Sequence, residues 1–371
     1  MINVAIVGAS GYSGAELVRL LSRHPDVVLT HLFVSENSAD RMQPISALYG
    51  QLSGLCALPL EPLSLQAAAA LTSEDCDVIF LATDHRVSHD LAPVLIENGI
   101  VVIDLSGAFR IKDEDKFERF YGFALGAAQH ELMAERVYGL VDWVKRDELQ
   151  QARLISMPGC YPTASQLALK PLCANQELGI KGLLDEDMPP VINAVSGVSG
   201  AGRKATLTNS LCEVSLNAYG LFKHRHLIEI EEQLGTKVIF NPHLGNFKRG
   251  ILATITARLK PSVRSEDVQN AYLRAYPQAL SQMQDAILSK ALGESDVAPA
   301  HNELSSCVRL KQGTIKLGDV EHTPFCDISF VVDGKYIVIS SAIDNLLKGA
   351  ASQAIEAMNL HFGLPRTRCL L

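Results

Sequence analysis

Near its start the chain carries the stretch Ile2-Asn3-Val4-Ala5-Ile6-Val7-Gly8-Ala9-Ser10-Gly11-Tyr12-Ser13-Gly14. Its first six residues are mostly apolar, which is typical of a buried strand, and the pattern from Tyr12 to Arg23 predicts a helix. Glycines at positions 8, 11 and 14 separate the two elements, a variant of the dinucleotide-binding spacing. The stretch therefore predicts a strand, a tight turn and a helix N-terminus, the unit that begins a doubly wound α/β sheet.

The same turn predicts a nicotinamide cofactor, because small residues let a pyrophosphate approach backbone N–H groups at a helix N-terminus. The alternative is a purely structural βα turn. Glu36 lies where an acid would bind a ribose 2′-hydroxyl, whereas Ser35 and Arg41 could hold a 2′-phosphate, so the residues leave both NAD and NADP open. The cofactor contacts predicted from the turn are Gly8, Ser10, Gly11, Tyr12, Ser13 and Gly14.

The rest of the first 150 residues alternates strand and helix patterns, which predicts a parallel, Rossmann-type sheet with ligands at the carboxyl ends of its strands. Further strands are expected at Val27–Val34, Val78–Ala82 and Val101–Leu105, and a helix at Ser88–Asn98.

After Pro158 the pattern changes to longer strands with few helices, which predicts an α+β domain with a mostly antiparallel sheet. Helices are expected at Pro162–Pro171, Ile228–Leu234, Ser262–Leu280 and Asn345–Asn359, and strands at Pro190–Ala194, Val238–Phe240, Gly250–Leu259, Phe325–Val332 and Tyr336–Ile343. We expect a dinucleotide-binding domain over 1–155, completed by 344–371, and a catalytic, substrate-binding and oligomerisation domain over 156–343.

The composition limits the possible partners. The net charge is 33 minus 41, or −8, which argues against nucleic acid and anionic membrane as partners. No apolar run is long enough to span a bilayer, and the first residues lack the basic segment of a signal peptide. Eight cysteines without a CxxC pair predict thiols in a reducing compartment, so we expect a cytoplasmic protein.

The stretch Met157-Pro158-Gly159-Cys160-Tyr161-Pro162-Thr163-Ala164 predicts a nucleophile. Pro162 suits the first turn of a helix, where its missing N–H costs nothing. Cys160 then lies at a helix N-terminus, where the macrodipole and unpaired N–H groups favour a thiolate and could stabilise an oxyanion. The alternative is a buried, inert thiol.

Histidines supply the candidates for proton transfer to such a thiolate. Phe222-Lys223-His224-Arg225-His226 offers two imidazoles, and His243 is a third. The segment is also compatible with a polar turn before a helix, or with a zinc site formed by His224, His226 and Cys160.

Two further segments contain residues that are suited to bind an anion. Asp104 to Arg110 follows a strand, so Ser106 is expected near the cofactor and Arg110 near the phosphate or carboxylate of a substrate. Ser196 to Lys204 is a glycine-rich loop with two cations, and it predicts Ser199 and Arg203 as substrate contacts. The alternative for this loop is a solvated connection.

The motifs PGCYPTA, SGVSGAGRK and HRH occur together and in this order, and with them the chain resembles the N-acetyl-gamma-glutamyl-phosphate reductase family. The resemblance implies that NADPH reduces an acyl phosphate to a semialdehyde, with release of phosphate and through a thioester on Cys160. It also implies His224 as the acid–base residue and Asn345 as a residue near the nicotinamide. We assign His226 to the substrate side and His243 to structural support, and we expect a homo-oligomer, either dimer or tetramer. The matching segments are Val7–Gly14, Asp104–Arg110, Tyr138–Leu140, Pro158–Ala164, Ser196–Arg203, His224–Glu229, Pro242–Ile251 and Asp344–Ala351.

Two residues depart from the family pattern. Asp142 stands where many members have Glu, and Asn37 stands where some have an Arg near the 2′-phosphate. The alternatives within the class are aspartate-semialdehyde dehydrogenase and the acetylated aminoadipyl-phosphate reductase. Outside the class they are a nucleotide-sensing protein without catalysis and a zinc hydrolase.

Overall fold

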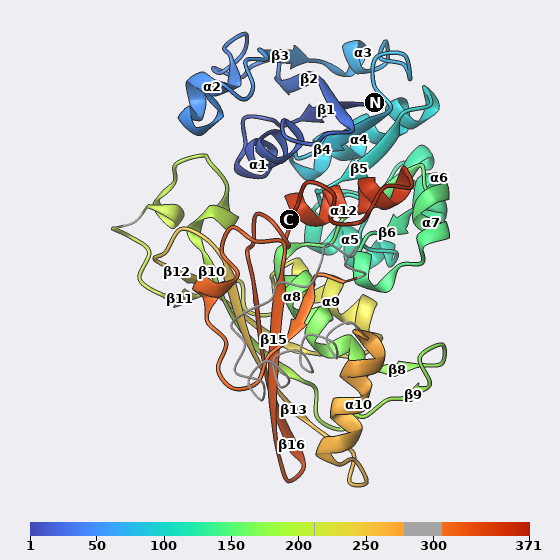
Figure 1. Ribbon diagram of the computed structural model, residues 1–371, viewed down its shortest axis with the longest axis vertical. Coiled ribbons are helices and arrows are strands. Elements are labelled where there is room, and N and C mark those ends of the chain that lie inside the picture. Colours follow the sequence, from blue (N-terminus) through green and yellow to red (C-terminus); the bar gives the residue numbers. More distant parts are fainter. Residues whose placement is uncertain (211, 278–305) are drawn as a thin grey trace, which may run out of the picture. The chain divides into compact units, whose positions relative to one another are not determined.

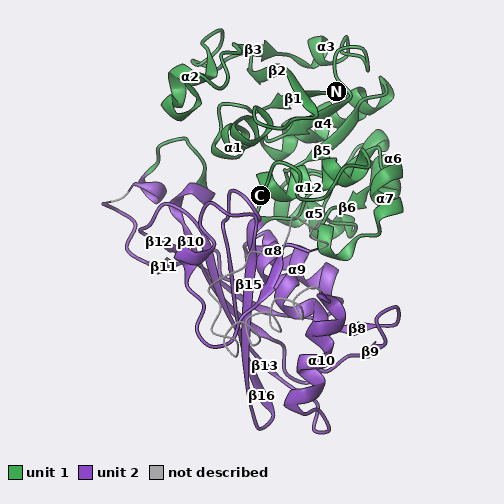
Figure 2. Cartoon of the chain, viewed as in Figure 1, with its two compact units in different colours: residues 1–159, 201–206, 349–371 green, residues 160–200, 207–348 purple. Residues whose placement is uncertain are grey.

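The computed structural model describes residues 1–210, 212–277 and 306–371 (Figure 1). The chain divides into two compact units (Figure 2). Unit 1 contains residues 1–159, 201–206 and 349–371, and unit 2 contains residues 160–200 and 207–348.

Unit 1 is built on a seven-stranded sheet in the order β3-β2-β1-β4-β5-β7-β6, with every neighbouring pair parallel. The predicted parallel, doubly wound sheet is therefore confirmed. The strand order reverses between β1 and β4, and ligands bind such sheets at the carboxyl edge of this switch point. The strands are β1 (Ile2–Val7), β2 (Val27–Ser35), β3 (Leu60–Leu63), β4 (Val78–Leu81), β5 (Val101–Asp104), β6 (Val137–Tyr138) and β7 (Leu154–Ser156).

The central strands of this sheet are buried, as expected when helices cover a parallel sheet. All four residues of β4 are buried, as are residues 4–7 of β1. The helices of unit 1 are α1 (Tyr12–Leu21), α2 (Ile45–Leu48), α3 (Leu65–Ala68), α4 (His85–Glu97), α5 (Glu114–Tyr121), α6 (Ala127–Glu135), α7 (Arg146–Gln151) and α12 (Ala351–His361), with short 3₁₀ turns η1 (Gly50–Leu52) and η2 (Val141–Trp143).

The C-terminal segment is held to unit 1 by buried ion pairs. Helix α12 packs against α1 and α7. Arg366 lies 2.6 Å from the Glu356 carboxylate and 2.9 Å from that of Asp142, and all three side chains are nearly inaccessible. The amide of Asn359 donates to the carbonyls of Arg366 and Arg368. Asp142, one of the two family departures, thus helps to anchor the tail.

Unit 2 contains a seven-stranded sheet in the order β11-β12-β10-β13-β16-β15-β14. Only the pairs β10–β12 and β14–β15 are parallel, so the predicted mostly antiparallel sheet is confirmed. The strands are β10 (Val191–Gly197), β11 (Asn217–Ala218), β12 (Ile239–Gly245), β13 (Ile251–Arg258), β14 (Val308–Leu310), β15 (Cys326–Asp333) and β16 (Tyr336–Ile343), and a separate pair is formed by β8 (Ala174–Asn175) and β9 (Ile180–Lys181).

Helix α8 packs on β13, β15 and β16, and α9 packs on α8, so the sheet of unit 2 is covered on this face. The helix predicted at Ser262–Leu280 runs from Ser265 to Ala275, and residues 278–280 of that prediction lie outside the described residues. The helices are α8 (Cys160–Leu169), α9 (His226–Leu234) and α10 (Ser265–Ala275), with 3₁₀ turns η3 (Lys170–Leu172), η4 (Val198–Ala201), η5 (Leu207–Asn209) and η6 (Leu317–Asp319).

The helix predicted at Asn345–Asn359 begins only at Ala351. The carboxylate of Asp344 accepts the backbone N–H groups of Leu346 and Leu347 at 2.9 and 3.1 Å, which fixes a turn before the helix. Such local side-chain bonds compete with helix formation. Within the described ranges 1–210, 212–277 and 306–371, no helix has the length and apolar character needed to cross a membrane.

Candidate active site

The glycine turn of unit 1 has the geometry of a dinucleotide-binding turn. Gly8 has a φ of +82°, and a Cβ there would lie 2.3 Å from the carbonyl oxygen of Ala82. A Cβ at Gly14 would lie 2.3 Å from the Gly8 oxygen. Both positions require glycine, whereas a Cβ on Gly11 would meet that oxygen only at 3.3 Å. Gly11 directly precedes α1, whose first N–H groups lack intrahelical partners, so the turn fits a pyrophosphate.

Arg203 lies on the same side of unit 1 as this turn. Its guanidinium is 2.5 Å from the carboxylate of Asp40, and the pKa of Arg203 is raised by that ion pair. Tyr49 and Tyr12 are close enough to Arg203 to interact with its charge. The Tyr49 hydroxyl donates to the Ser10 carbonyl at 2.8 Å. The structure therefore groups Arg203 with the turn residues, although the sequence predicted it as a substrate contact.

The residues expected near a 2′-phosphate lie at the carboxyl end of β2. Ser35, Glu36 and Arg41 are all exposed there. Arg41 donates to the Glu36 carbonyl at 3.4 Å, and the Ser35 hydroxyl accepts the N–H of Asn37 at 3.4 Å. Neither bond is short, so both side chains remain available to a phosphate.

The loop after β5 is buried and tightly bonded. The carboxylate of Asp104 accepts both the N–H and the hydroxyl of Ser106, at 2.9 and 3.0 Å, and burial raises its pKa. Arg110 donates through Nε to the Met157 carbonyl at 2.8 Å and through Nη2 to the Leu105 carbonyl at 2.7 Å. Ser106 and Arg110 are less than 5% exposed, and Arg110 holds the segment that leads to Cys160 through its bond to Met157.

His85 also lies at the carboxyl edge of the sheet of unit 1, and it was not predicted as a site residue from the sequence. It is the first residue of α4, and its Nδ1 accepts the N–H of Gly107 at 2.7 Å. Its ring meets Tyr121 edge-on at 5.1 Å. Its place directly after β4, at the carboxyl edge of the sheet, was the signal that could have identified it.

Cys160 is the first residue of α8 and the only one of its residues that is not buried. The far end of the helix is fixed, because the Leu167 and Ala168 carbonyls accept the hydroxyls of Tyr276 and Tyr272, each at 2.6 Å. All eight cysteines fall within the described residues and are thiols. The arrangement presents one partly exposed thiol at the N-terminus of an anchored helix, where anionic sulfur is favoured.

An aromatic cluster surrounds the residue after the nucleophile. The Tyr161 hydroxyl donates to the His243 carbonyl at 2.8 Å, and Tyr219 donates to Tyr161 at 3.4 Å. The Tyr161 ring meets those of His224 and His226 at 5.7 and 5.9 Å, and the two imidazoles are 4.8 Å apart. Burial raises the pKa of Tyr161, so it stays a neutral donor. The structure thus brings His224 and His226 together beside the residue that follows Cys160.

The three predicted histidines differ in their bonding. Burial, with a smaller contribution from Arg225, lowers the pKa of His224 to about 4. His226 is buried at the start of α9. His243 Nδ1 lies 3.0 Å from the Asn241 carbonyl, so it carries the proton and donates. The His243 carbonyl accepts from Tyr161 and its ring donates to Asn241, so both groups already have partners.

The alternative zinc site of Cys160, His224 and His226 is not formed. In the part of the chain that the structure describes, no group of three or more His, Cys, Asp or Glu side chains could hold a metal ion.

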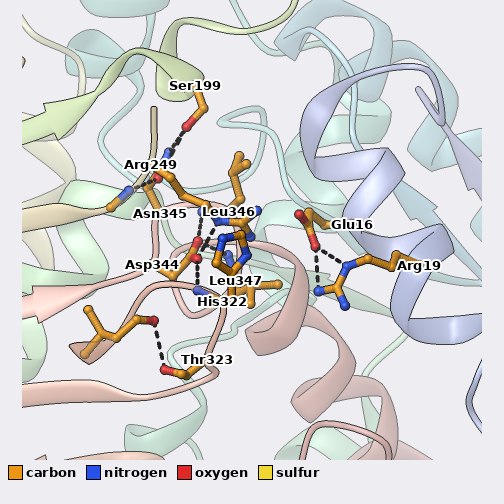
Figure 3. Close-up of polar contacts among 12 residues, drawn as sticks. Glu16, Arg19, Ser199, Arg249, His322, Thr323, Asp344, Asn345, Leu346 and Leu347 are labelled. Carbon is orange, nitrogen blue, oxygen red and sulfur yellow. Dashed lines mark hydrogen bonds and ion pairs between the residues drawn. The ribbon is translucent and has the colours of Figure 1, made fainter. Parts of the chain in front are cut away.

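The glycine-rich loop of unit 2 is fixed by Asn345 (Figure 3). The Asn345 side chain donates to the Ser199 hydroxyl at 3.0 Å and accepts the N–H of Gly250 at 2.6 Å. Next to it, the buried Asp344 pairs with Arg249 at 2.5 Å. Gly197 needs its lack of a side chain, because a Cβ would lie 2.5 Å from the Arg249 nitrogen. Asn345 and Ser199, predicted to contact cofactor and substrate respectively, lie together in this unit.

Comparisons with known proteins define the class. The semialdehyde dehydrogenase NAD-binding domain matches residues 3–152, and the semialdehyde dehydrogenase dimerisation domain matches residues 160–286. The fold is similar to that of aspartate semialdehyde dehydrogenase II from Vibrio cholerae, with a TM-score of 0.66, 14% identity and 98% of both chains covered. It is also similar to aspartate semialdehyde dehydrogenase with NADP from Candida albicans, with a TM-score of 0.63 and 13% identity over 97% and 99% of the two chains. The chain has the fold of the semialdehyde dehydrogenases.

Relatives of similar sequence show which family of this fold class the chain belongs to. The chain is 50% identical to N-acetyl-gamma-glutamyl-phosphate reductase of Pectobacterium carotovorum and 51% identical to that of Yersinia pseudotuberculosis, over the full length of each. It belongs to the N-acetyl-gamma-glutamyl-phosphate reductase family.

Proposed function

We propose that the protein reduces N-acetyl-gamma-glutamyl phosphate to N-acetylglutamate semialdehyde and phosphate, with NADPH as reductant. The observation that carries the proposal is the partly exposed Cys160 at the start of the anchored helix α8, next to a residue that packs on two imidazoles. This arrangement suits acyl transfer to a thiolate, and the relatives that match the whole chain are named for this substrate.

In this reaction the Cys160 thiolate attacks the acyl carbon, a C–S bond forms, and the C–O bond to phosphate breaks. The first N–H groups of α8 stabilise the sulfur anion and the oxygen that becomes negative. After reduction of the thioester carbon, the thiohemiacetal collapses and returns the sulfur as thiolate. We assign His224 to the reacting carbonyl oxygen and His226 to the substrate side.

The cofactor proposal rests on the turn of unit 1. The residues that would hold the dinucleotide are those of the turn at positions 8–14, together with Ser35 and Arg41 at a 2′-phosphate. When bound, a nicotinamide supplies hydride. Because Arg203 pairs with Asp40 near Tyr12, we move it from the substrate to the cofactor in this proposal. Arg110, with its donors bonded to carbonyls, holds the Met157 end of the nucleophile segment.

The function is tested by phosphate-dependent NADP⁺ reduction with a panel of semialdehydes. We expect N-acetylglutamate semialdehyde to give the highest kcat/KM. A preference for aspartate semialdehyde or for the acetylated aminoadipate semialdehyde would establish one of the alternative reductases instead. The absence of turnover with all three, in protein that binds NADP⁺, would favour a nucleotide-sensing role.

We also propose that the enzyme is a cytoplasmic homo-oligomer. The dimerisation-domain match and the thiol state of all eight cysteines support this.

A further inference from the structure

A cavity of about 460 Å³ lies in unit 2, between helix α10, the β8–β9 pair and the loop that precedes α10. The helix lies beside the strand pair (Figure 1), and Arg274 on α10 donates to the carbonyl of Gly179, between β8 and β9, at 3.3 Å. Small-molecule sites usually have volumes of about 300–1,000 Å³. The cavity is therefore large enough for an organic ligand and not only for a single inorganic ion.

The walls of this cavity are held by hydrogen bonds of the fold. The backbone N–H of Lys260 donates to the Leu183 carbonyl at 2.9 Å, and that of Leu183 donates to the Leu172 carbonyl at 2.8 Å. The wall formed by α10 is fixed by the buried Tyr272 and Tyr276, whose hydroxyls donate to carbonyls of α8, each at 2.6 Å. A ligand would therefore enter a formed cavity, which lowers the entropic cost of binding.

Positive charge predominates in the lining. Lys181, Lys260 and Arg274 line the cavity, and Asp267 supplies one carboxylate. That carboxylate accepts the backbone N–H of Arg264 at 2.8 Å, and the Arg264 side chain lies 3.8 Å from it, so its charge is already compensated. The whole chain has a net charge of −8, so this local excess of cations runs against the composition. The lining therefore favours an anion.

Several polar groups of the lining are not used by the protein itself. In the part of the chain that the structure describes, the side chains of Lys181, Ser262 and Asn270 have no hydrogen-bond partner. Lys260 lies 3.5 Å from Glu186, whose side chain is 87% exposed, and exposed pairs of this kind add little to stability. A ligand can therefore bind to these groups without breaking a strong interaction of the fold.

We propose that this cavity binds a small organic anion with at least two carboxylate or phosphate groups. Its acidic groups pair with the three cations of the lining through charge-assisted hydrogen bonds, which are stronger than neutral ones. Its carbon skeleton lies on the apolar part of the lining, formed by Ile180, Val263 and Ala271.

The site is separate from the proposed active site. Its lining contains none of the residues assigned to the reaction. Helix α10 is bonded to α8 at Leu167 and Ala168, the end of α8 away from Cys160. At 1.5 Å per residue, Leu167 lies about 10 Å along the helix from Cys160. An anion in this cavity is therefore a second ligand, in addition to the acyl phosphate.

Binding can be measured on the full chain with two probes, citrate for carboxylates and glycerol 3-phosphate for phosphate esters. The protein carries ¹³C-labelled isoleucine methyl groups, and the signal of Ile180 is assigned by its loss in Ile180→Val. We expect this signal to shift saturably with at least one probe, with a Kd on the order of 1 mM or lower. The probe with the lower Kd identifies the preferred acidic group. Neutral glycerol should cause no shift. The absence of a saturable shift with both anions, or an equal shift with glycerol, would overturn the proposal.

Charge variants test whether the cations of the cavity bind the probe. Lys181→Met and Arg274→Met each remove one exposed cation and should each raise the Kd at least about fivefold, the effect of one charged contact. Lys316→Met removes an exposed lysine of unit 2 that does not line the cavity, and this matched control should leave the Kd unchanged. Equal Kd values in wild type and in both cavity variants would show that the anion binds elsewhere and would overturn the proposal. Because no turnover is measured, this result is independent of the proposed reductase activity.

Discussion

At the scale of single residues, the clearest prediction concerns the nucleophile. Cys160→Ser should abolish reduction, by more than about 10³-fold, because a serine hydroxyl is not ionised at the start of α8 as a thiol can be. Nucleotide binding, measured by calorimetry, should be unchanged, because the glycine turn belongs to unit 1. Turnover within about tenfold of wild type, an effect of only ~1.4 kcal/mol, would exclude the covalent mechanism.

Arg203 provides a second residue-scale prediction. Arg203→Gln should raise the KM for the nicotinamide cofactor about tenfold, or ~1.4 kcal/mol, with little change in the KM of the acyl substrate. Asp40→Asn is the matched control, because it releases Arg203 from its ion pair and should not weaken cofactor binding. The two KM values come from steady-state assays with each substrate varied. A selective rise in the KM of the acyl substrate would restore the substrate role predicted from sequence.

Burial of His224 also predicts how stability depends on pH. Its pKa is about 4 in the folded protein and 6.5 as a free side chain, so the unfolded chain binds more protons between these values. The free energy of unfolding therefore decreases as the pH falls from about 6.5 towards 4, by up to ~2–3 kcal/mol from this residue. Urea denaturation of wild type and His224→Gln at pH 7 and pH 5 should show a smaller loss in the variant. Equal losses in both would contradict the lowered pKa.

The residue-level predictions from sequence succeeded where the signal was local. The helix that begins at Cys160 follows from Pro162 two residues later, and the turn at Gly8 follows from the glycine spacing next to a strand. The partners of Arg203 and Arg110 could not be predicted from local sequence, because Asp40 and Met157 are distant from them along the chain. A cation in a glycine-rich loop is compatible with any anionic ligand, and only its neighbours in the structure indicate which ligand it would contact.

At the scale of elements, strands were easier to predict than helix ends. β1 and β16 have the predicted bounds because each is an apolar or alternating run between turn residues. The start of α12 was predicted too early, because Asp344 bonds to the backbone N–H groups after it and to Arg249. The short strands β6 and β7 have too few residues to show a period. They are defined only by pairing, of β7 with β5 and of β6 with β7.

The anchoring of α12 gives a prediction for this element. Arg366→Leu should lower the free energy of unfolding by about 3–5 kcal/mol, because it removes the guanidinium that the buried Glu356 and Asp142 share. Asp142→Glu keeps the charge and should therefore lower the free energy of unfolding less than Arg366→Leu does. Urea denaturation monitored by circular dichroism measures both. If Arg366→Leu lowered the free energy of unfolding by less than about 1 kcal/mol, the usual contribution of an exposed ion pair, these buried pairs would add little to stability.

At the scale of the whole molecule, the residues assigned to the proposed reaction are divided between the two units. The points at which the chain passes from one unit to the other decide which unit contains each residue. It leaves unit 1 after Gly159, so Cys160 is the first residue of unit 2. It returns briefly at 201–206, which brings Arg203 into unit 1, and again at 349–371, which supplies α12. Residues that are neighbours in the glycine-rich loop, such as Ser199 and Arg203, therefore belong to different units.

The sheet of unit 2 leads to the prediction about assembly. On the hairpin of β15 and β16, Val331 pairs with Val338, and both are exposed, at 68% and 41%, together with Tyr336. Adjacent apolar side chains on an open sheet face are typical of an interface, and a two-fold axis would bring two copies of this face together.

We therefore expect the wild-type protein to be a dimer or a larger oligomer, and Val331→Asp or Val338→Asp to shift it towards monomer. Light scattering after size exclusion at several concentrations gives the mass, and Val87→Asp, at an exposed valine of unit 1, is the matched control. An unchanged mass in both hairpin variants, or a wild-type protein that is monomeric throughout, would show that this face is not the interface.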